Sequence, residues 1–240
     1  MLTWFVSDLH LDPARPDAIQ LAQRFFSNTA KGAEHVYILG DLFEYWLGDD
    51  NPKHGLEPVL EAFSALTQSG TKITFMHGNR DFLIGDQFAS QYNIDLITDD
   101  EQVIDLYGTP TLIMHGDTLC TDDHDYLKFR TLVRDPTWQG NILSQTLEER
   151  IQFVGKLRKM SQGAMQEKSS DIMDANQAAV EEAMVRHRVS QLIHGHTHRP
   201  AVHTVPLPHQ AGQRWVLGEW TDHAKVLRCS STDMALITFR

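Results

Sequence analysis

Five short apolar runs in this chain each end at a polar residue, and this recurrence constrains the fold more than any other feature of the sequence. Each run has the length of a buried strand, and longer segments with helical spacing of apolar residues lie between some of them. The runs are Thr3–Val6, His35–Leu39, Lys72–Met76, Thr111–Met114 and Gln191–Ile193. Strands that alternate with helices predict crossover connections and a largely parallel sheet that helices cover.

Two of the segments between these runs carry clear helix signals. Residues Asp17–Lys31 place apolar side chains on one face, and Glu57–Ser69 begins with a proline at its second residue and stops before Gly70. After Pro200 the pattern changes to short β-like runs separated by Gly, Pro and Asp, namely Arg214–Leu217, Lys225–Arg228 and Ala235–Phe239. We therefore expect a second, more antiparallel sheet, and an α/β sandwich of two sheets.

The stretch between His124 and His187 has no convincing strand pattern. Apolar residues recur there at helical spacing, at Leu143, Leu147, Ile151, Val154 and Leu157. We predict a helical insertion over residues 124–187 within a single domain of residues 1–240. No internal repeat and no linker rich in Pro, Gly or Ser divides the chain.

The composition limits the classes of function. The chain has 32 Asp and Glu against 21 Lys and Arg, a net charge of −11, whereas a general nucleic-acid binder needs a basic surface. Its two cysteines, Cys120 and Cys229, form no CxxC, so neither a disulfide framework nor a thiolate zinc site is indicated. No stretch is apolar enough to span a bilayer, and Met1–Leu11 lacks the basic start of a signal peptide. We expect a cytoplasmic protein with no nucleic-acid partner.

The polar residues at the ends of the five runs are all of types that bind metal ions. They read Asp8-Leu9-His10, Gly40-Asp41, Gly78-Asn79, His115-Gly116-Asp117 and Gly195-His196-Thr197-His198. Each fragment alone is more typical of a cap or a turn than of a ligand. However, loops at the carboxyl ends of parallel strands share one edge of a sheet, so the conjunction favours a metal site.

The donors in these fragments also indicate the chemistry. Seven nitrogen and oxygen ligands without a thiolate are too many for one ion and suit two divalent ions of the Mn, Fe, Co, Ni or Zn group. Two ions about 3.5–4 Å apart hold a deprotonated water and neutralise charge that develops on a phosphoryl group. The sequence therefore predicts hydrolysis of a phosphate ester or anhydride.

This ordered series resembles the calcineurin-like metallophosphoesterases, whose pattern is DxH, GD, GN, H and GHxH at successive strand ends. The resemblance implies an α/β/β/α sandwich of two sheets with an inserted helical lid. It also implies two sets of ligands with a bridge: Asp8, His10 and His198 for one ion, Asn79, His115 and His196 for the other, and Asp41 between them.

Longer stretches are similar to one group within this superfamily, the UDP-2,3-diacylglucosamine diphosphatases of the LpxH type. Between residues 7 and 203 they read SDLHL, YILGDLFEYWLGDD, HGNRDFLIG, LIMHGDTLCTDD, IMDANQ and LIHGHTHRPAVH. The resemblance implies water attack on the uridylyl phosphorus of UDP-2,3-diacylglucosamine, which gives UMP and 2,3-diacylglucosamine 1-phosphate in lipid A synthesis. It further implies two Mn²⁺ ions and peripheral contact with the cytoplasmic face of the inner membrane. We take a monomer as the default state.

Arg80 stands where many metallophosphoesterases carry His. An alkoxide leaving group needs a proton, but a phosphate monoester, with a second pKa of about 6, leaves readily without one. Arg80 therefore favours an anhydride substrate, to which its planar guanidinium would donate charge-assisted hydrogen bonds.

The resemblance also assigns roles by position within the matching motifs. The catalytic set is Asp41, Asn79, Arg80, His115 and His196. The substrate contacts are Asn79, Arg80, Asp123, Ser161, Met165, Lys168 and His196, with Met165 where the family often carries Asn. Two alternatives stay open: another two-metal phosphodiesterase or phosphatase of the superfamily, and a scaffold on the same fold that has lost catalysis.

The insertion can be interpreted in two ways. Residues 124–170 hold eight basic and five acidic side chains, so this segment is basic within an acidic chain. Composition alone favours an amphipathic subdomain with its own core. The resemblance instead implies a lid whose apolar interior takes acyl chains, with basic residues that favour an anionic bilayer surface.

Overall fold

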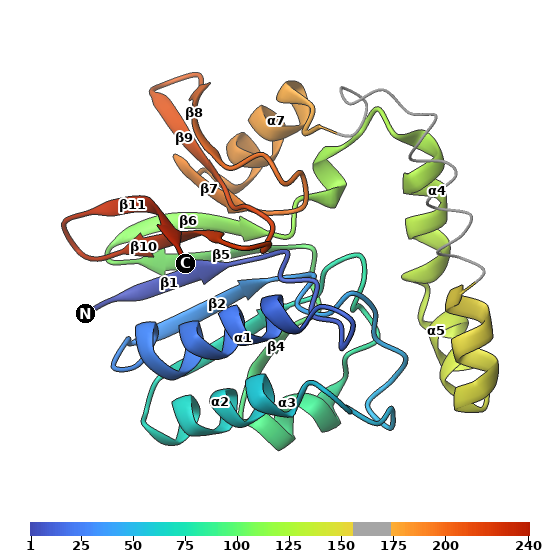
Figure 1. Ribbon diagram of the computed structural model, residues 1–240. Helices are drawn as coiled ribbons and strands as arrows, with labels where there is room; N and C mark the ends of the chain where they lie inside the picture. Colours follow the sequence, from blue (N-terminus) through green and yellow to red (C-terminus); the bar gives the residue numbers. More distant parts are fainter. Residues whose placement is uncertain (156–173) are drawn as a thin grey trace.

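The computed structural model describes residues 1–155 and 174–240, and its strands form two sheets packed on one another (Figure 1). The first sheet has the strand order β11-β10-β1-β2-β3-β4. Its parallel strands are β1 (Thr3–Val6), β2 (His35–Leu39), β3 (Lys72–Met76) and β4 (Asp95–Ile97). Beside β1, the sheet continues with two antiparallel strands, β10 (Ala224–Cys229) and β11 (Met234–Phe239).

The second sheet has the order β5-β6-β7-β9-β8. Its three central strands, which are parallel, are β6 (Thr109–Met114), β7 (Gln191–His194) and β9 (Ala211–Val216). The antiparallel edge strands are β5 (Glu101–Leu106) and β8 (Ala201–Pro206).

All five strands predicted from the apolar runs form, but they do not share one sheet. The first three belong to the first sheet, whereas β6 and β7 lie in the second. The prediction of a separate C-terminal sheet is also wrong, because β9 joins the second sheet while β10 and β11 extend the first. The local sequence pattern predicts which segments form strands, but it does not predict which strands pair with one another. The chain changes sheets through β4 and β5, which are partly exposed edge strands without a continuous apolar run.

Successive side chains of the first sheet point to opposite faces, and each face packs into its own hydrophobic core. In β1, Trp4 and Val6 pack on the helix side, whereas Phe5 faces the second sheet. The helices on that side are α1 (Pro16–Arg24), α2 (Glu57–Gln68) and α3 (Asp86–Tyr92). The second sheet is covered in turn by α7 (Gln177–His187), through Val180, Ala183 and Met184. The α/β/β/α sandwich is therefore confirmed.

The helix predictions hold closely. The helix expected over Asp17–Lys31 is α1 followed by a π-helical turn, Phe25–Thr29, so it ends two residues early. The helix expected over Glu57–Ser69 is α2, which ends at Gln68.

The described part of the insertion is helical. It contains α4 (His124–Val133), α5 (Pro136–Leu143), a helical stretch over residues 147–155 and α7. Of these, α7 covers the second sheet, whereas α4 and α5 lie beyond the carboxyl ends of the strands (Figure 1). Thr146 and Glu149 cap the last stretch reciprocally, since each accepts a hydrogen bond from the backbone N–H of the other. Within the described residues no helix is both long and apolar enough to cross a membrane.

Candidate metal centre

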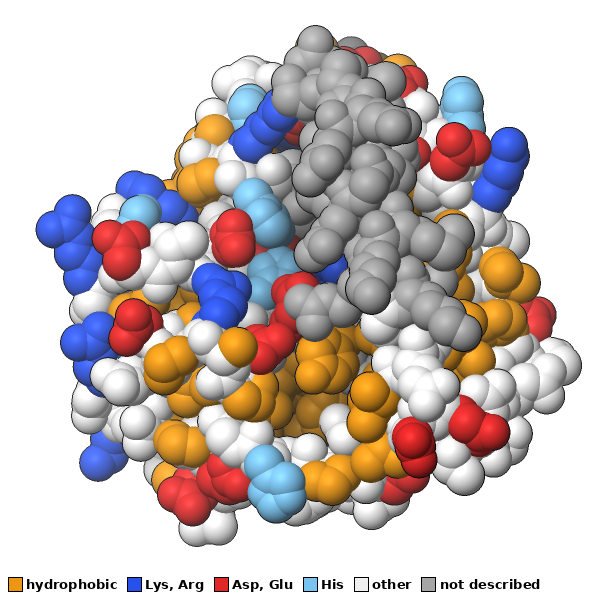
Figure 2. Space-filling view, turned by 45° about the vertical axis from the view of Figure 1, so that its right-hand side comes forward, with side chains coloured by type: hydrophobic (Ala, Val, Ile, Leu, Met, Phe, Trp, Pro, Cys, Tyr) orange, Lys and Arg blue, Asp and Glu red, His pale blue; other side chains and the backbone are white. Residues whose placement is uncertain are grey.

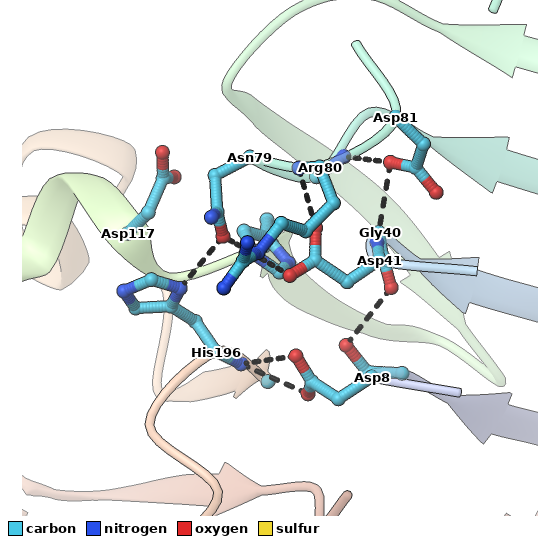
Figure 3. A network of polar contacts seen from close by, with 12 residues as sticks. Asp8, Gly40, Asp41, Asn79, Arg80, Asp81, Asp117 and His196 are labelled. Atoms are coloured by element: carbon cyan, nitrogen blue, oxygen red, sulfur yellow. Dashed lines mark hydrogen bonds and ion pairs between the residues drawn. The ribbon is translucent and has the colours of Figure 1, made fainter. Parts of the chain in front are cut away.

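The five strand ends meet on one face of the molecule. The loops after β1, β2 and β3 carry Asp8, Asp41 and Asn79, and those after β6 and β7 carry His115 and His196. Figure 3 shows Asp8, Asp41, Asn79 and His196 in one network of polar contacts. In Figure 2, acidic and histidine side chains gather in a hollow of this face, next to a patch of apolar ones.

The backbone of these loops is held in an uncommon conformation. Among the described residues, eight other than glycine have a positive φ, and five of them are candidate ligands: Asp8, His10, Asp41, His196 and His198. Such a conformation costs energy for residues with a Cβ and persists where the surrounding structure enforces it, often at functional sites.

Two glycines permit the close approach of these loops. A Cβ on Gly78 would collide with the backbone and carboxylate of Asp41, and one on Gly195 would collide with Ser7 and Asp8. The GN and GH of the motifs therefore keep a glycine for steric reasons, and the ligand that follows each glycine can reach its neighbours.

His115 indicates that a positive charge belongs in this space. Its Nδ1 lies 2.8 Å from the carbonyl oxygen of Leu39, which can only accept, so Nδ1 carries the proton. In the neutral ring the Nε2 lone pair then faces two more acceptors, Oδ1 of Asn79 at 2.8 Å and Oδ2 of Asp41 at 3.7 Å. Burial opposes a charge on the ring, but the carboxylates of Asp41 and Asp117 outweigh it and raise the pKa of His115. A cation among these acceptors removes the repulsion.

His10 and His198 have the same arrangement. Nδ1 of His10 lies 3.0 Å from a carboxylate oxygen of Glu44, and Nδ1 of His198 lies 3.2 Å from one of Glu219. Their Nε2 atoms are 3.3 Å apart, and that of His198 is 3.4 Å from Oδ1 of Asp8. Burial lowers the pKa of His198, yet hydrogen bonds to Asp8 and Glu219 raise it to about 10. A carboxylate behind each ring is the arrangement that orients histidine ligands of metals.

The carboxylate of Asp41 lies between His10 and His115. Its Oδ2 is 3.8 Å from Nε2 of His10 and 3.7 Å from Nε2 of His115. Its Oδ1 accepts a hydrogen bond of 2.9 Å from the backbone N–H of Arg80. One oxygen of this buried carboxylate is thus fixed by the β3 loop, while the other faces both histidines.

The described residues contain two groups whose donor atoms all lie within 4.8 Å of one another: Asp8, His10 and His198, and Asp8, Asp41 and His115. Asn79 and His196 complete the set, because Oδ1 of Asn79 lies 3.0 Å from Nδ1 of His196. Burial lowers the pKa of His196 to about 4, so the ring is neutral and can offer a lone pair. These nitrogen and oxygen donors fit two divalent ions.

The remaining predicted residues are placed differently. Arg80 is half-buried, and within the described part of the chain its guanidinium has no hydrogen-bonding or ion-pair partner. Asp123 is a buried N-cap of α4, where it accepts a hydrogen bond of 3.1 Å from the N–H of Tyr126. Ser161, Met165 and Lys168 lie outside the described residues.

Asp81 was not expected from the sequence. It is fully buried and accepts hydrogen bonds from the backbone N–H groups of Asp41, Leu42, Phe43 and Gly78, so it joins the β2 and β3 loops (Figure 3). Burial raises the pKa of Asp81 to about 7, and the charge of Asp41 adds to this effect. Its place directly after Asn-Arg in the matching motif was the available signal.

Asp117 was quoted within a motif but given no role. Its carboxylate accepts hydrogen bonds from the hydroxyl of Tyr126 at 2.5 Å and Nε of Arg130 at 2.7 Å, both on α4. The ring of Tyr126 also stacks on His196, with 6.1 Å between ring centroids. The insertion is thereby joined to the loop that follows β6.

Comparison with known proteins accounts for this geometry. The sequence-family model of the calcineurin-like phosphoesterases matches residues 1–200. The chain belongs to this family. Membership implies divalent metal ions at the site, and the two groups of donors agree with that.

Individual relatives extend this phosphoesterase assignment along the whole chain. A UDP-2,3-diacylglucosamine hydrolase of Stenotrophomonas maltophilia (strain K279a) is 44% identical over 245 residues, which cover 99% of this chain and 98% of the relative. One of Serratia proteamaculans (strain 568) is 46% identical over 239 residues, 100% of this chain and 99% of the relative. A solved archaeal phosphodiesterase shares the fold at 16% identity, with a TM-score of 0.52 and 99% of each chain covered.

Proposed function

We propose that this phosphoesterase hydrolyses the pyrophosphate bond of UDP-2,3-diacylglucosamine to UMP and 2,3-diacylglucosamine 1-phosphate. The observation that carries the proposal is the likeness, at 44–46% identity over nearly the full length, to hydrolases named for that substrate. The reaction places the chain in lipid A synthesis.

The proposed ligands follow the family resemblance, and the donor groups of the structure support them. Asp8, His10 and His198 would hold one ion, Asn79, His115 and His196 would hold the other, and Asp41 would be shared between them. When bound, the ions supply an activated water and neutralise charge on the phosphoryl oxygens. Mn²⁺ is the proposed metal, because hard oxygen and imidazole donors without thiolate accept it.

The chain's own residues orient the substrate. Arg80 donates to the diphosphate, since its guanidinium has no partner among the described residues and adjoins Asn79 in sequence. Water attacks the uridylyl phosphorus, and the sugar 1-phosphate leaves without needing a proton. Asp123 hydrogen-bonds the sugar or its amide, and Ser161, Met165 and Lys168 are proposed as further contacts from the family resemblance alone.

The helical insertion is proposed as a lid over the acyl chains. Four of its described apolar side chains are exposed, at Phe129, Leu132, Leu143 and Ile151. Its basic residues would favour an anionic membrane surface, so the chain is proposed to work at the cytoplasmic face of the inner membrane. A monomer is the proposed oligomeric state.

The test is product analysis in ¹⁸O-labelled water. The purified chain is incubated with Mn²⁺ and UDP-2,3-diacylglucosamine, with a chelated sample and the Asp41→Ala variant as controls. The proposal predicts label in UMP and no products in either control. Absence of turnover together with brisk cleavage of bis-p-nitrophenyl phosphate would keep a two-metal phosphodiesterase and reject the lipid substrate. Label in the sugar phosphate would reject attack at the uridylyl phosphorus.

A further inference from the structure

A cavity whose wall combines charged and apolar side chains lies on the outer face of the second sheet, next to the loop that carries His196 and His198. Its volume is about 260 Å³, several times the roughly 30 Å³ that one water occupies in the liquid. Arg214 on β9 and His203 on β8 are opposite each other in the strand register, so both side chains leave the same face of the sheet. Thr197 brings the metal-centre loop to the cavity wall.

Arg214 is the unusual member of this cavity. Its residue is only 7% exposed, and its Nε and Nη1 atoms are buried without an acceptor. Within residues 1–155 and 174–240, Arg214 makes neither a hydrogen bond nor an ion pair. Asp174 attracts Arg214 electrostatically but forms no hydrogen bond with it. A buried guanidinium whose N–H groups lack acceptors is unfavourable, so a native chain keeps one where something else supplies the acceptor.

The neighbouring side chains do not supply it. Oδ2 of Asp174 contacts Nη1 of Arg199 at 2.5 Å, and its Oδ1 accepts from the N–H of Ala175 at 2.8 Å. Burial, aided by the charge of Arg214, lowers the pKa of His203, and a histidine ring carries no negative charge that could balance Arg214. Two arginines against one aspartate leave the cavity wall positive in a chain of net charge −11.

We propose that this cavity binds a phosphate-class oxyanion, with the guanidinium of Arg214 as the principal donor. A guanidinium suits this ligand because its planar N–H groups match phosphate oxygens. The cavity is large enough for the anion, and its wall includes Thr197 of the metal-centre loop but none of the proposed metal ligands. Free phosphate and the phosphoryl end of a nucleoside monophosphate share this chemistry, and the inference does not depend on the proposed reaction.

The test is thermal unfolding of the full chain with a chelator present, which prevents anions from binding through metal ions. Inorganic phosphate and UMP are titrated separately at constant ionic strength. At five times the dissociation constant, the melting temperature should rise by roughly 2–4 °C. Arg214→Met should abolish the rise, whereas Arg228→Met, which removes an exposed arginine paired with Asp233, should keep it.

The outcomes separate the sources and can reject the site. A rise with phosphate alone indicates the free ion, and a rise with both ligands indicates that a monoester also enters. No rise in the unmodified chain, or an equal rise in Arg214→Met, would overturn the proposal. Because Arg214→Met could fold poorly, crystals of the unmodified chain soaked in selenate give a second answer: an anomalous peak beside Arg214 is expected, and its absence contradicts the site.

Discussion

Asp41 links the two halves of the candidate metal centre. One carboxylate oxygen faces His10 and His115 at 3.8 and 3.7 Å, and the other is fixed by the N–H of Arg80. Asp81 holds the same loop from behind through the backbone. A bridging role for Asp41 therefore depends on a carboxylate whose position is set by the loop after β3.

Arg80→Ala should lower kcat by about 10²–10³-fold, the usual cost of losing one donor to transition-state charge. Mn²⁺ binding should be unchanged, because the contact with Asp41 is made by the Arg80 backbone, which alanine retains. Steady-state kinetics and a Mn²⁺ titration of the same sample check both statements, and Arg80→Lys should lose less. Unchanged turnover would remove Arg80 from the reaction.

At this scale the sequence predicted the donors and missed the groups behind them. Asp8, Asp41 and His115 were identifiable from the sequence because each follows a strand-length apolar run. Glu44 and Glu219 were not, because they meet His10 and His198 only through the tertiary fold. A residue that contacts a ligand from a distant loop has no local sequence pattern.

Among the elements, the insertion is tied to the metal-centre face by arginines. Nη2 of Arg134 donates to the carbonyl of Gly78 at 2.8 Å, and Arg130 pairs with Asp117. Arg150 is buried, donates to the carbonyl of Leu47 and pairs with Asp50. Each contact joins a helix of the insertion to a loop near a strand's carboxyl end.

Arg150→Met should therefore loosen the helical stretch over residues 147–155. If the insertion holds acyl chains, kcat/KM for the diacylated substrate should fall about tenfold, which corresponds to about 1.4 kcal/mol. Metal-dependent cleavage of bis-p-nitrophenyl phosphate, which has no acyl chain, should stay unchanged. Arg228→Met, which removes an exposed arginine of β10, serves as the control. An equal loss with both substrates would argue against a lid.

Contacts between Glu101 on β5 and the end of α7 should make the free energy of unfolding depend on pH. Burial opposes the charge of Glu101, but hydrogen bonds from Arg186 and His187 lower its pKa. The stabilisation is thus present above the unfolded pKa of about 4.3 and is lost as pH falls through the lower folded value. Glu101→Gln should reduce the free energy of unfolding by about 1 kcal/mol at pH 7.

Urea unfolding at pH 7 and pH 3 measures this difference. The gap between Glu101→Gln and the unmodified chain should narrow at pH 3, and hydrolysis at pH 7 should be unaffected because Glu101 lies on β5, outside the metal centre. A gap of the same size at both pH values would show that the pair does not act through its charge.

The elements also mark the limit of sequence-based prediction. Buried strands such as β1, β2 and β3 were found with their bounds, because burial makes their apolar runs continuous. The edge strand β8 was missed, since alternate residues along it are exposed and interrupt the apolar pattern. Sheet membership was wrong because strand pairing depends on contacts between distant segments, which no local run encodes.

Across the whole molecule, the fold brings acidic and histidine side chains from both sheets to one face. The chain carries a net charge of −11, so an anionic substrate is repelled unless positive charge is present locally. Metal ions held by the donors around Asp8 and Asp41 would supply this positive charge at the proposed site of hydrolysis. The fold, its net charge and the proposed two-ion hydrolysis therefore agree.

The most direct measurement of the two-ion site is a Mn²⁺ titration that records bound ions per chain and turnover of UDP-2,3-diacylglucosamine in the same samples. We expect the unmodified chain to bind two ions and turnover to appear only as the second one binds. Asp41→Asn should bind fewer than two and hydrolyse nothing measurable. Full turnover with one ion per chain, or two ions and normal turnover in Asp41→Asn, would contradict a shared site bridged by Asp41.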